Sequence, residues 1–324
     1  MEIYVDLTEI KKPFPNSCVT IGNFDGVHLG HQILFSEVVS KAYQQQGTSV
    51  AITFTPHPLQ VVRPDSGLKL ISNCEQKREL IEMAGIDVLI IIPFTKPFAA
   101  TPAEEFVDDV LIKTIGVKEL VVGYDYAFGK GREGDISFLK DQGYKKGFPV
   151  SVVEPYYVDG VLASSTKVRE LVKEGRMMDV KALLGRPYQI RGEVKIGKQR
   201  GGAQLGFPTA NLDISSEDLC PKHGVYVTQV IYDGKCYGGV LNIGYNPTFG
   251  DGKLSAETHI FDFNQDIYGK PIKINLLRFL RGEHKFSGPE ELARQIGEDV
   301  KQAKQVLEDA QKEILLSCEE RYNR

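Results

Sequence analysis

The segment 18–31 reads CVTIGNFDGVHLGH and sets two histidines and three glycines between an apolar run and a helical pattern. The run Cys18–Ile21 predicts a short buried strand, and apolar residues at helical spacing over 31–43 predict a helix. Glycine permits the tight turn and the close approach to a ligand that such a junction needs. A helix that begins near Gly30 would present free N–H groups and the positive end of its dipole, which suit a phosphate. The segment therefore predicts a strand–turn–helix unit with a phosphate site at its turn.

The first half of the chain continues this alternation. Apolar runs at 50–54, 88–92, 120–122 and 150–153 predict strands, and short helices are expected at 167–174 and 178–184. A capping box over Thr101–Glu104 predicts the start of another helix, whose inward residues are Phe106, Val107, Val110 and Leu111. Alternating strands and helices indicate a mostly parallel, Rossmann-like sheet with helices on both faces.

After residue 187 the pattern changes to successive strands. They are expected at 189–196, 225–232, 236–243, 255–263 and 272–279, with Asp233-Gly234 as a tight hairpin turn. Strands without intervening helices indicate an antiparallel β-barrel. A long C-terminal helix, capped by Ser287–Glu290, carries an apolar stripe of Leu292, Ile296, Val300, Ala303, Leu307, Ala310 and Ile314. We expect the stripe to cover the barrel, and a dimeric coiled coil is the alternative.

The bulk composition bounds the class of protein. A chain of 324 residues with 42% apolar and 25% charged residues predicts two domains, which we place at 1–184 and 185–324. The net charge of −4 provides no basic excess for nucleic acid or a membrane surface, so neither is expected as a partner. Five cysteines without a CxxC pair, and no evident signal peptide or apolar span, predict a cytoplasmic protein. Whether the chain forms a homo-oligomer is left open by the sequence.

The two histidines of the first segment can act on a phosphorus atom. His28 and His31 are three residues apart, so both can point to one side of the helix start. Donors fixed there would stabilise the charge that gathers on the oxygens of a pentavalent phosphorus. The alternative is zinc, held by His28, His31 and His57 with Asp25, as in a metal-dependent phosphoesterase. The spacing HLGH lacks the acidic residue of the common zinc motif HExxH.

Other segments of the first half offer phosphate and ring contacts. Ser164, Ser165 and Thr166 precede a helix, where hydroxyls cap the helix or bind phosphate, and Arg169 can grip phosphate oxygens in a fork. Two further loops follow parallel strands, whose carboxyl ends are the usual place for a ligand. Their residues of interest are Pro56, His57, Pro58, Asp125, Tyr126 and Phe128.

The second half contains one glycine-rich run, GKQRGGAQLGFPTAN at 197–211. A P-loop is excluded because Gln199 stands where Ser or Thr should reach magnesium, and no helix follows. Thr209 and Asn211 are two residues apart, so they face one side of an extended chain. Their hard oxygen atoms suit a magnesium ion bound to ATP phosphates.

These motifs, in order and over nearly the whole chain, resemble those of the bacterial bifunctional riboflavin kinase/FMN adenylyltransferase (FAD synthetase) family. HLGH resembles the HxGH of nucleotidyltransferases, and SSTKVR resembles the ISSTxxR loop, although Leu162-Ala163 and Lys167 depart from its usual residues. PTAN and Glu257 resemble the magnesium motif and the catalytic glutamate of riboflavin kinases. Arg281 lies in a segment similar to LRxExxF.

The resemblance implies an adenylyltransferase domain with in-line attack on ATP and a kinase domain that makes FMN from riboflavin. It implies ATP as co-substrate, Mg²⁺ as cofactor, and riboflavin, FMN and FAD as substrates or products. The implied catalytic residues are His28, His31, Asp125 and Glu257, and the implied metal ligands are Thr209 and Asn211. The implied nucleotide contacts are Gly22, Asn23, Phe24, Gly30, Ser164, Ser165, Thr166, Arg169, Lys198, Gly206 and Pro208. The implied flavin contacts are Pro56, His57, Pro58, Tyr126, Phe128 and Arg281. A non-catalytic flavin-binding module is the remaining alternative.

Overall fold

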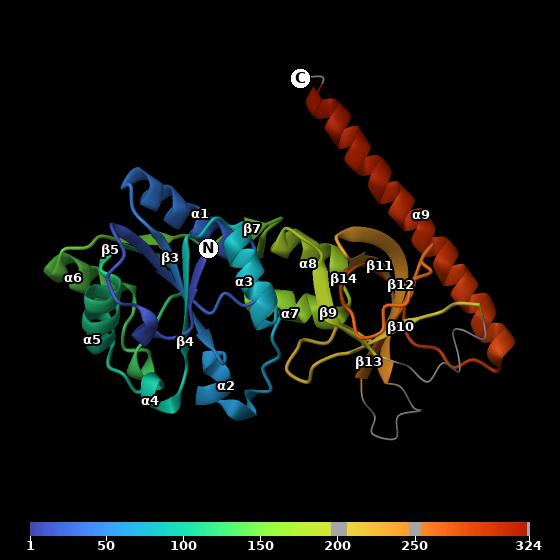
Figure 1. Ribbon diagram of the computed structural model, residues 1–324, viewed down its shortest axis with the longest axis horizontal. Helices are drawn as coiled ribbons and strands as arrows, with labels where there is room; N and C mark the ends of the chain where they lie inside the picture. Colours follow the sequence, from blue (N-terminus) through green and yellow to red (C-terminus); the bar gives the residue numbers. More distant parts are fainter. Residues whose placement is uncertain (196–205, 246–253, 323–324) are drawn as a thin grey trace. The chain divides into compact units, whose positions relative to one another are not determined.

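The computed structural model describes residues 1–195, 206–245 and 254–322, with the side chains of 245 and 310–322 excepted. The chain packs as two compact units, Met1–Val168 and Arg169–Arg324, and the division falls within helix α7 (Ser165–Glu174). The domain boundary expected at 184/185 stays a prediction. Each unit has its own sheet, coloured blue to green in the first and yellow to orange in the second (Figure 1).

The first unit is built on a six-stranded sheet whose order is β1-β4-β3-β2-β5-β6. Every neighbouring pair is parallel, as predicted. The order changes direction between β2 and β5, and in open parallel sheets the ligand site lies at the carboxyl ends beside such a switch point. The strands are β1 (Glu2–Tyr4), β2 (Ser17–Ile21), β3 (Ser49–Thr55), β4 (Val88–Pro93), β5 (Val117–Gly123) and β6 (Val150–Val153).

Helices cover both faces of this sheet, which confirms the predicted layering (Figure 1). Helices α1 (Leu29–Gln44) and α3 (Cys74–Met83) pack Phe35 and Ile81 against Ala51, Leu89 and Val121 on one face. The helical turns η3 (Phe106–Ile115) and helix α6 (Ile136–Lys146) cover the opposite face of the sheet, where every second strand residue points. The smaller elements are η1 (Leu7–Glu9), α2 (Pro58–Val62), η2 (Pro64–Ser66), α4 (Lys96–Ala99), α5 (Ala103–Glu105), η4 (Lys130–Arg132), β7 (Tyr157–Val158) and β8 (Val161–Leu162).

The predicted capping box at Thr101–Glu104 is wrong. Helix α5 begins after Pro102 without a side-chain cap from its own segment. The amide of Ala103 instead donates to Oε1 of Glu133 at 2.9 Å, a carboxylate from a loop thirty residues away. The helix continues as the π-helical turns of η3, and the predicted inward residues, Phe106, Val107, Val110 and Leu111, are all buried.

The second unit contains a closed antiparallel barrel of order β10-β13-β12-β11-β14-β9, as predicted. Asp233-Gly234 forms the two-residue turn between β11 and β12, and positive φ angles of 48° and 71° match a type I′ hairpin. The strand expected to reach residue 263 ends at Ile260. The elements are α8 (Met177–Leu184), β9 (Tyr188–Lys195), β10 (Ala210–Asp213), β11 (Gly224–Tyr232), β12 (Lys235–Tyr245), β13 (Leu254–Ile260) and β14 (Pro271–Arg281).

The long helix α9 (Pro289–Tyr322) covers part of the outer face of the barrel. Its residues Val300, Ala303 and Leu307 pack against a buried cluster that contains Val225, Val227, Val240 and Phe261. This contact confirms that the stripe covers the barrel, over the residues whose side chains are described. Beyond the barrel the helix continues as a single rod to the C-terminal end (Figure 1). The stripe residues Ala310 and Ile314 lie outside the described side chains.

We expect Ala303→Leu to destabilise the second unit, because Ala303 is fully buried between α9 and the barrel. Overpacking such a site costs about 1–3 kcal/mol. The control is Gln302→Leu, which adds the same side chain at an exposed position of the same helix. Urea unfolding followed by circular dichroism measures both. Equal unfolding midpoints for the two variants would contradict the packing of α9.

Candidate active sites

The loop after β2 is folded tightly against the first unit. Phe24 and Val27 have positive φ angles of 48° and 40°, which non-glycine residues rarely adopt, and Gly26 has a φ of 80°. Both side chains are only 1% exposed, so burial against the α1 face of the sheet offsets the backbone strain. Space at Gly30 is tight, because a Cβ there would lie 3.2 Å from the ring of His28 and 3.3 Å from the carbonyl oxygen of Ala163. The conformation of the loop thus depends on its buried apolar residues and on its glycines.

Asp25 holds this loop in place. Its Oδ1 accepts hydrogen bonds from the amides of Ile71 and Ser72 at 3.0 and 3.1 Å, and the hydroxyl of Ser72 accepts from the amide of Gly26 at 3.0 Å. The carboxylate is buried and engaged by the backbone that leads into α3. Asp25 is therefore a structural residue of the loop.

The two predicted phosphate segments of the first half come together. The hydroxyl of Ser165 donates to the carbonyl oxygen of Asp25 at 2.9 Å, and the neighbouring Ala163 backbone lies against Gly30. Ser164 caps α7 by accepting from the amide of Lys167 at 3.2 Å. Thr166 follows in the first turn of α7. The two helix starts, those of α1 and α7, therefore lie beside one loop.

His28 and His31 lie at the start of α1 as predicted. His28 is the N-cap residue, and the two imidazoles stack with centroids 3.7 Å apart. The ring of Phe24 meets His31 edge-on at 5.3 Å. Burial lowers the pKa of His31 well below its ordinary value, and His28 and Lys77 lower it further. His31 is therefore neutral near pH 7 and can donate one N–H to a phosphate oxygen.

The residues expected to contact flavin follow β5 and β3. Tyr126 stacks on Phe128 with centroids 5.6 Å apart, and its hydroxyl is buried without a hydrogen-bond partner among the described residues. Phe128 packs on Phe106 of the core, which accounts for it as a packing residue, and its flavin contact stays a prediction. Asp125 is exposed directly after β5.

The segment Pro56-His57-Pro58 begins a short helix. His57 is the N-cap of α2, and its Nδ1 accepts from the amide of Leu59 at 3.2 Å. The described residues contain no group of three histidine, cysteine or carboxylate side chains that could hold a metal. With Asp25 bound to backbone amides and His57 capping α2, the geometry of the described residues does not support the zinc alternative.

The register of the barrel aligns the candidate kinase residues. Asn211 on β10 lies directly opposite Glu257 on β13, and Glu257 lies opposite Asn242 on β12. Directly opposite residues on neighbouring strands point to the same face, with Cβ atoms about 5 Å apart. The residues on either side along these strands are buried inside the barrel, so this row faces outward. The full row is Lys195, Asn211, Glu257, Asn242, Val225 and Arg281.

A histidine fixes the turn that leads into this row. Nδ1 of His259, two residues beyond Glu257 on β13, lies 2.9 Å from the carbonyl oxygen of Pro208. The ring of Phe207 meets His259 edge-on at 5.5 Å. Thr209 follows Pro208 and immediately precedes β10. No sequence motif gives His259 a role, although its spacing of two from Glu257 on a strand signals a shared face.

Gly206 and Lys198 are two further residues of this unit predicted to bind nucleotide. Gly206 has a φ of 84°, which favours glycine at the turn before Phe207. Lys198 lies outside the described residues. The roles of both in nucleotide binding stay predictions.

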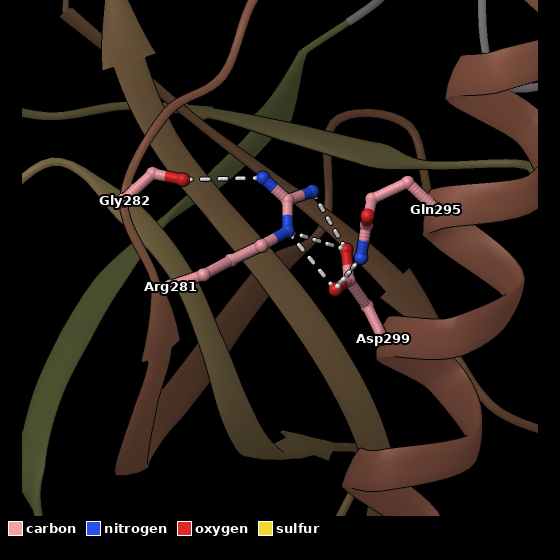
Figure 2. Close-up of polar contacts among 4 residues, drawn as sticks. All are labelled: Arg281, Gly282, Gln295 and Asp299. Atoms are coloured by element: carbon pink, nitrogen blue, oxygen red, sulfur yellow. Dashed lines mark hydrogen bonds and ion pairs between the residues drawn. The ribbon is translucent and has the colours of Figure 1, made fainter.

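Arg281 is tied to helix α9 (Figure 2). Its Nη2 donates to Oδ2 of the buried Asp299 at 2.7 Å, its Nε contacts both carboxylate oxygens, and its Nη1 donates to the carbonyl oxygen of Gly282 at 3.1 Å. Gln295, one turn earlier on α9, also donates to Asp299. The guanidinium therefore joins the end of β14 to the helix, and its contact with flavin stays a prediction.

Comparison with known proteins assigns the two units. The family model for FAD synthetase matches residues 10–167, and the model for riboflavin kinase matches residues 184–307. The parallel sheet that the first model covers and the antiparallel barrel that the second covers thus define a two-domain enzyme of flavin nucleotide synthesis. The chain belongs to the bifunctional riboflavin kinase/FMN adenylyltransferase family.

Curated relatives of that name cover most of the chain. The protein from Buchnera aphidicola is 34% identical over 303 residues, with 93% of this chain and 96% of that one covered. The protein from Listeria monocytogenes is 36% identical, with 88% and 90% covered, and the one from Escherichia coli K12 is 34% identical, with 89% and 91% covered.

A solved structure described as a macrolide-efflux protein from Streptococcus pneumoniae is also similar. Its TM-score is 0.84 at 31% identity, with 93% of this chain and 98% of that chain covered. The fold of this chain is therefore also found in a solved structure with a different name. None of the described helices combines the length and apolar character that crossing a bilayer needs.

The neutral state of His31 gives a prediction for stability against pH. Because the folded chain lowers the pKa of His31, the unfolded chain takes up this proton first as the pH falls through its ordinary value of 6.5. Below that pH, protonation of His31 in the unfolded chain should lower the unfolding free energy of the wild type by up to about 1.4 kcal/mol per pH unit. His31→Gln lacks this group and should not show that loss. Urea unfolding of both chains between about pH 7.5 and about pH 5.5 measures the difference. Parallel curves would show that His31 titrates normally.

Proposed function

We propose that the first unit transfers the adenylyl group of ATP to FMN at the loop between β2 and α1. The contact of Ser165 with Asp25 carries the proposal, because it puts the hydroxyl-rich start of α7 beside His28 and His31. Backbone N–H groups of both helix starts would bind the phosphates of ATP. The two imidazoles would donate to the oxygens of the α-phosphorus as the FMN phosphate attacks and diphosphate leaves.

The remaining residues of this unit divide into two groups. Gly22, Asn23, Phe24, Gly30 and Thr166 shape or line the loop after β2, and the triphosphate contact of Arg169, which the division of the chain assigns to the second unit, stays a prediction. The exposed Asp125 and the half-buried Tyr126 after β5, together with Pro56, His57 and Pro58 after β3, would surround the flavin and the reacting groups.

We propose that the second unit phosphorylates riboflavin at the row Asn211–Glu257–Asn242. Glu257 would accept the proton of the ribityl hydroxyl as its oxygen attacks the γ-phosphorus of ATP. The opposing register of Asn211 and Glu257 carries this proposal, because it puts a carboxylate and an amide side by side on an open face. His259 acts as a positioning residue for the Pro208–Thr209 turn.

A magnesium ion fits this second site. The side-chain oxygens of Thr209 and Asn211, with Glu257 opposite, are the hard donors that Mg²⁺ prefers, and such sites use few protein ligands together with phosphate oxygens. When bound, the ion neutralises charge on the β- and γ-phosphates. We further infer a cytoplasmic location, where ATP and both flavin substrates are available to the two units.

The first test separates the kinase. Glu257→Gln keeps the size and register of the side chain but removes the base, so FMN formation from riboflavin and ATP should fall by about 100-fold or more. FAD formation from supplied FMN should be unchanged. Chromatography of both reactions with the purified chain measures this. Loss of both activities together would contradict two independent sites.

The second test separates the adenylyltransferase. His31→Ala removes a fixed donor to the α-phosphate, so FAD formation should fall by about 100-fold or more while FMN formation persists. The same chromatographic assay gives both rates. A normal rate of FAD formation by this variant would remove His31 from the mechanism. A wild-type chain that binds flavin but makes neither product would leave only the non-catalytic binding module.

A further inference from the structure

A lysine outside the sequence motifs is fixed beside the loop that joins β2 to α1. Lys77 lies on α3, and its Nζ donates to the carbonyl oxygen of Asn23 and to Oγ1 of Thr53, each at 3.2 Å. The hydroxyl of Thr53 also donates to the same carbonyl oxygen at 3.2 Å. Asn23 belongs to the loop after β2, and Thr53 is a fully buried residue of β3. The ammonium group is therefore anchored where two central strands end.

The charge of Lys77 has no close counter-charge among the described residues. Both of its hydrogen-bond partners are neutral oxygens, and its third N–H has no partner in the part of the chain that the structure describes. Asp25 attracts it from a longer distance, but the oxygens of that carboxylate accept from the amides of Ile71 and Ser72. A partly buried cation without an ion pair is costly unless an anion completes the site.

Two groups near Lys77, Arg78 on the same helix and His31 on α1, also point to a site for an anion. Arg78 follows on α3, and its Nε is buried without a hydrogen-bond partner among the described residues. Burial lowers the pKa of Lys77 and the charge of Arg78 adds to this effect, against the attraction of Asp25 and Cys74. The charge of Lys77 in turn lowers the pKa of His31, so the ammonium acts electrostatically on one of the two stacked imidazoles. Perturbed groups that gather beside a loop of this kind mark a functional site.

We propose that Lys77 is a further substrate-binding residue of the adenylyltransferase site, where its ammonium pairs with a phosphate of a bound nucleotide. The inference rests on the proposed function of the first unit and adds a fixed positive charge to the donors of that site. ATP and FMN both carry phosphate, so the two substrates are distinguished by experiment. With the phosphate bound, the third N–H of Lys77 has an acceptor and the buried charge is neutralised.

The experiment compares Lys77→Gln, Lys77→Arg and the wild type as full chains. Glutamine can still donate to Asn23 and Thr53 but has no charge, and arginine keeps the charge. The matched control is Lys140→Gln, which removes an exposed lysine of α6 in the same unit. For each chain we would measure kcat/KM for FAD formation, the inhibition constant of inorganic diphosphate, the Kd of FMN, and the rate of FMN formation by the second unit.

We expect Lys77→Gln to lower kcat/KM for FAD formation by about 10- to 100-fold, the range of a charged hydrogen bond. Lys77→Arg should recover most of it, and FMN formation and the Lys140→Gln chain should be unchanged. Weaker inhibition by diphosphate would assign Lys77 to the phosphates of ATP, and weaker binding of FMN would assign it to the FMN phosphate.

Three results would overturn the inference. Lys77→Gln could keep its rate of FAD formation within about twofold, Lys77→Arg could lose as much as Lys77→Gln, or the first unit of Lys77→Gln could unfold in urea at a much lower midpoint. The last two would make Lys77 a structural residue. A wild-type chain that makes FMN but no FAD would instead contradict the proposed function of the first unit.

Discussion

The buried carboxylate of Asp25 is the interaction on which the first site depends. The loop after β2 contains Phe24 and Val27 at positive φ, and the amides of Ile71 and Ser72 would be buried without acceptors if the carboxylate were absent. Leaving such a group unsatisfied costs about 1–3 kcal/mol. The carbonyl of the same residue accepts from Ser165, so one residue joins the loop, the approach to α3 and the start of α7.

In the second unit, the candidate site depends on the register of the strands and not on one buried carboxylate. Because side chains alternate between the two faces of a strand, a slip of one residue would turn Glu257 into the barrel and Thr258 outward. The same row contains Val225, which is buried in the cluster that α9 covers, and Arg281, which pairs with Asp299 on that helix. Helix α9 therefore stabilises the register that aligns the candidate kinase residues. The helix itself packs beside these residues, on the part of the outer barrel face that contains Val225 and Val227.

Regular patterns in the sequence predicted the architecture well. The apolar runs 50–54 and 88–92 gave β3 and β4 because fully buried parallel strands are continuous in apolar residues. Helix α3 was missed because its segment CEQKRELIEM buries only Gln76 and Ile81, too few for a visible period. The cap of α5 was wrong because its acceptor, Glu133, is distant in the sequence. Motifs likewise located His28, His31, Asn211 and Glu257, whereas Lys77 and His259 needed the tertiary contacts.

The two candidate sites also differ in the groups that they present. The first presents donors: backbone N–H groups, the neutral imidazole of His31 and the ammonium of Lys77. On the barrel, the carboxylate of Glu257 lies directly opposite Asn211 and would repel phosphate oxygens. A divalent cation held by Thr209 and Asn211 would offset that repulsion, so the charge of Glu257 is an argument for the proposed magnesium site.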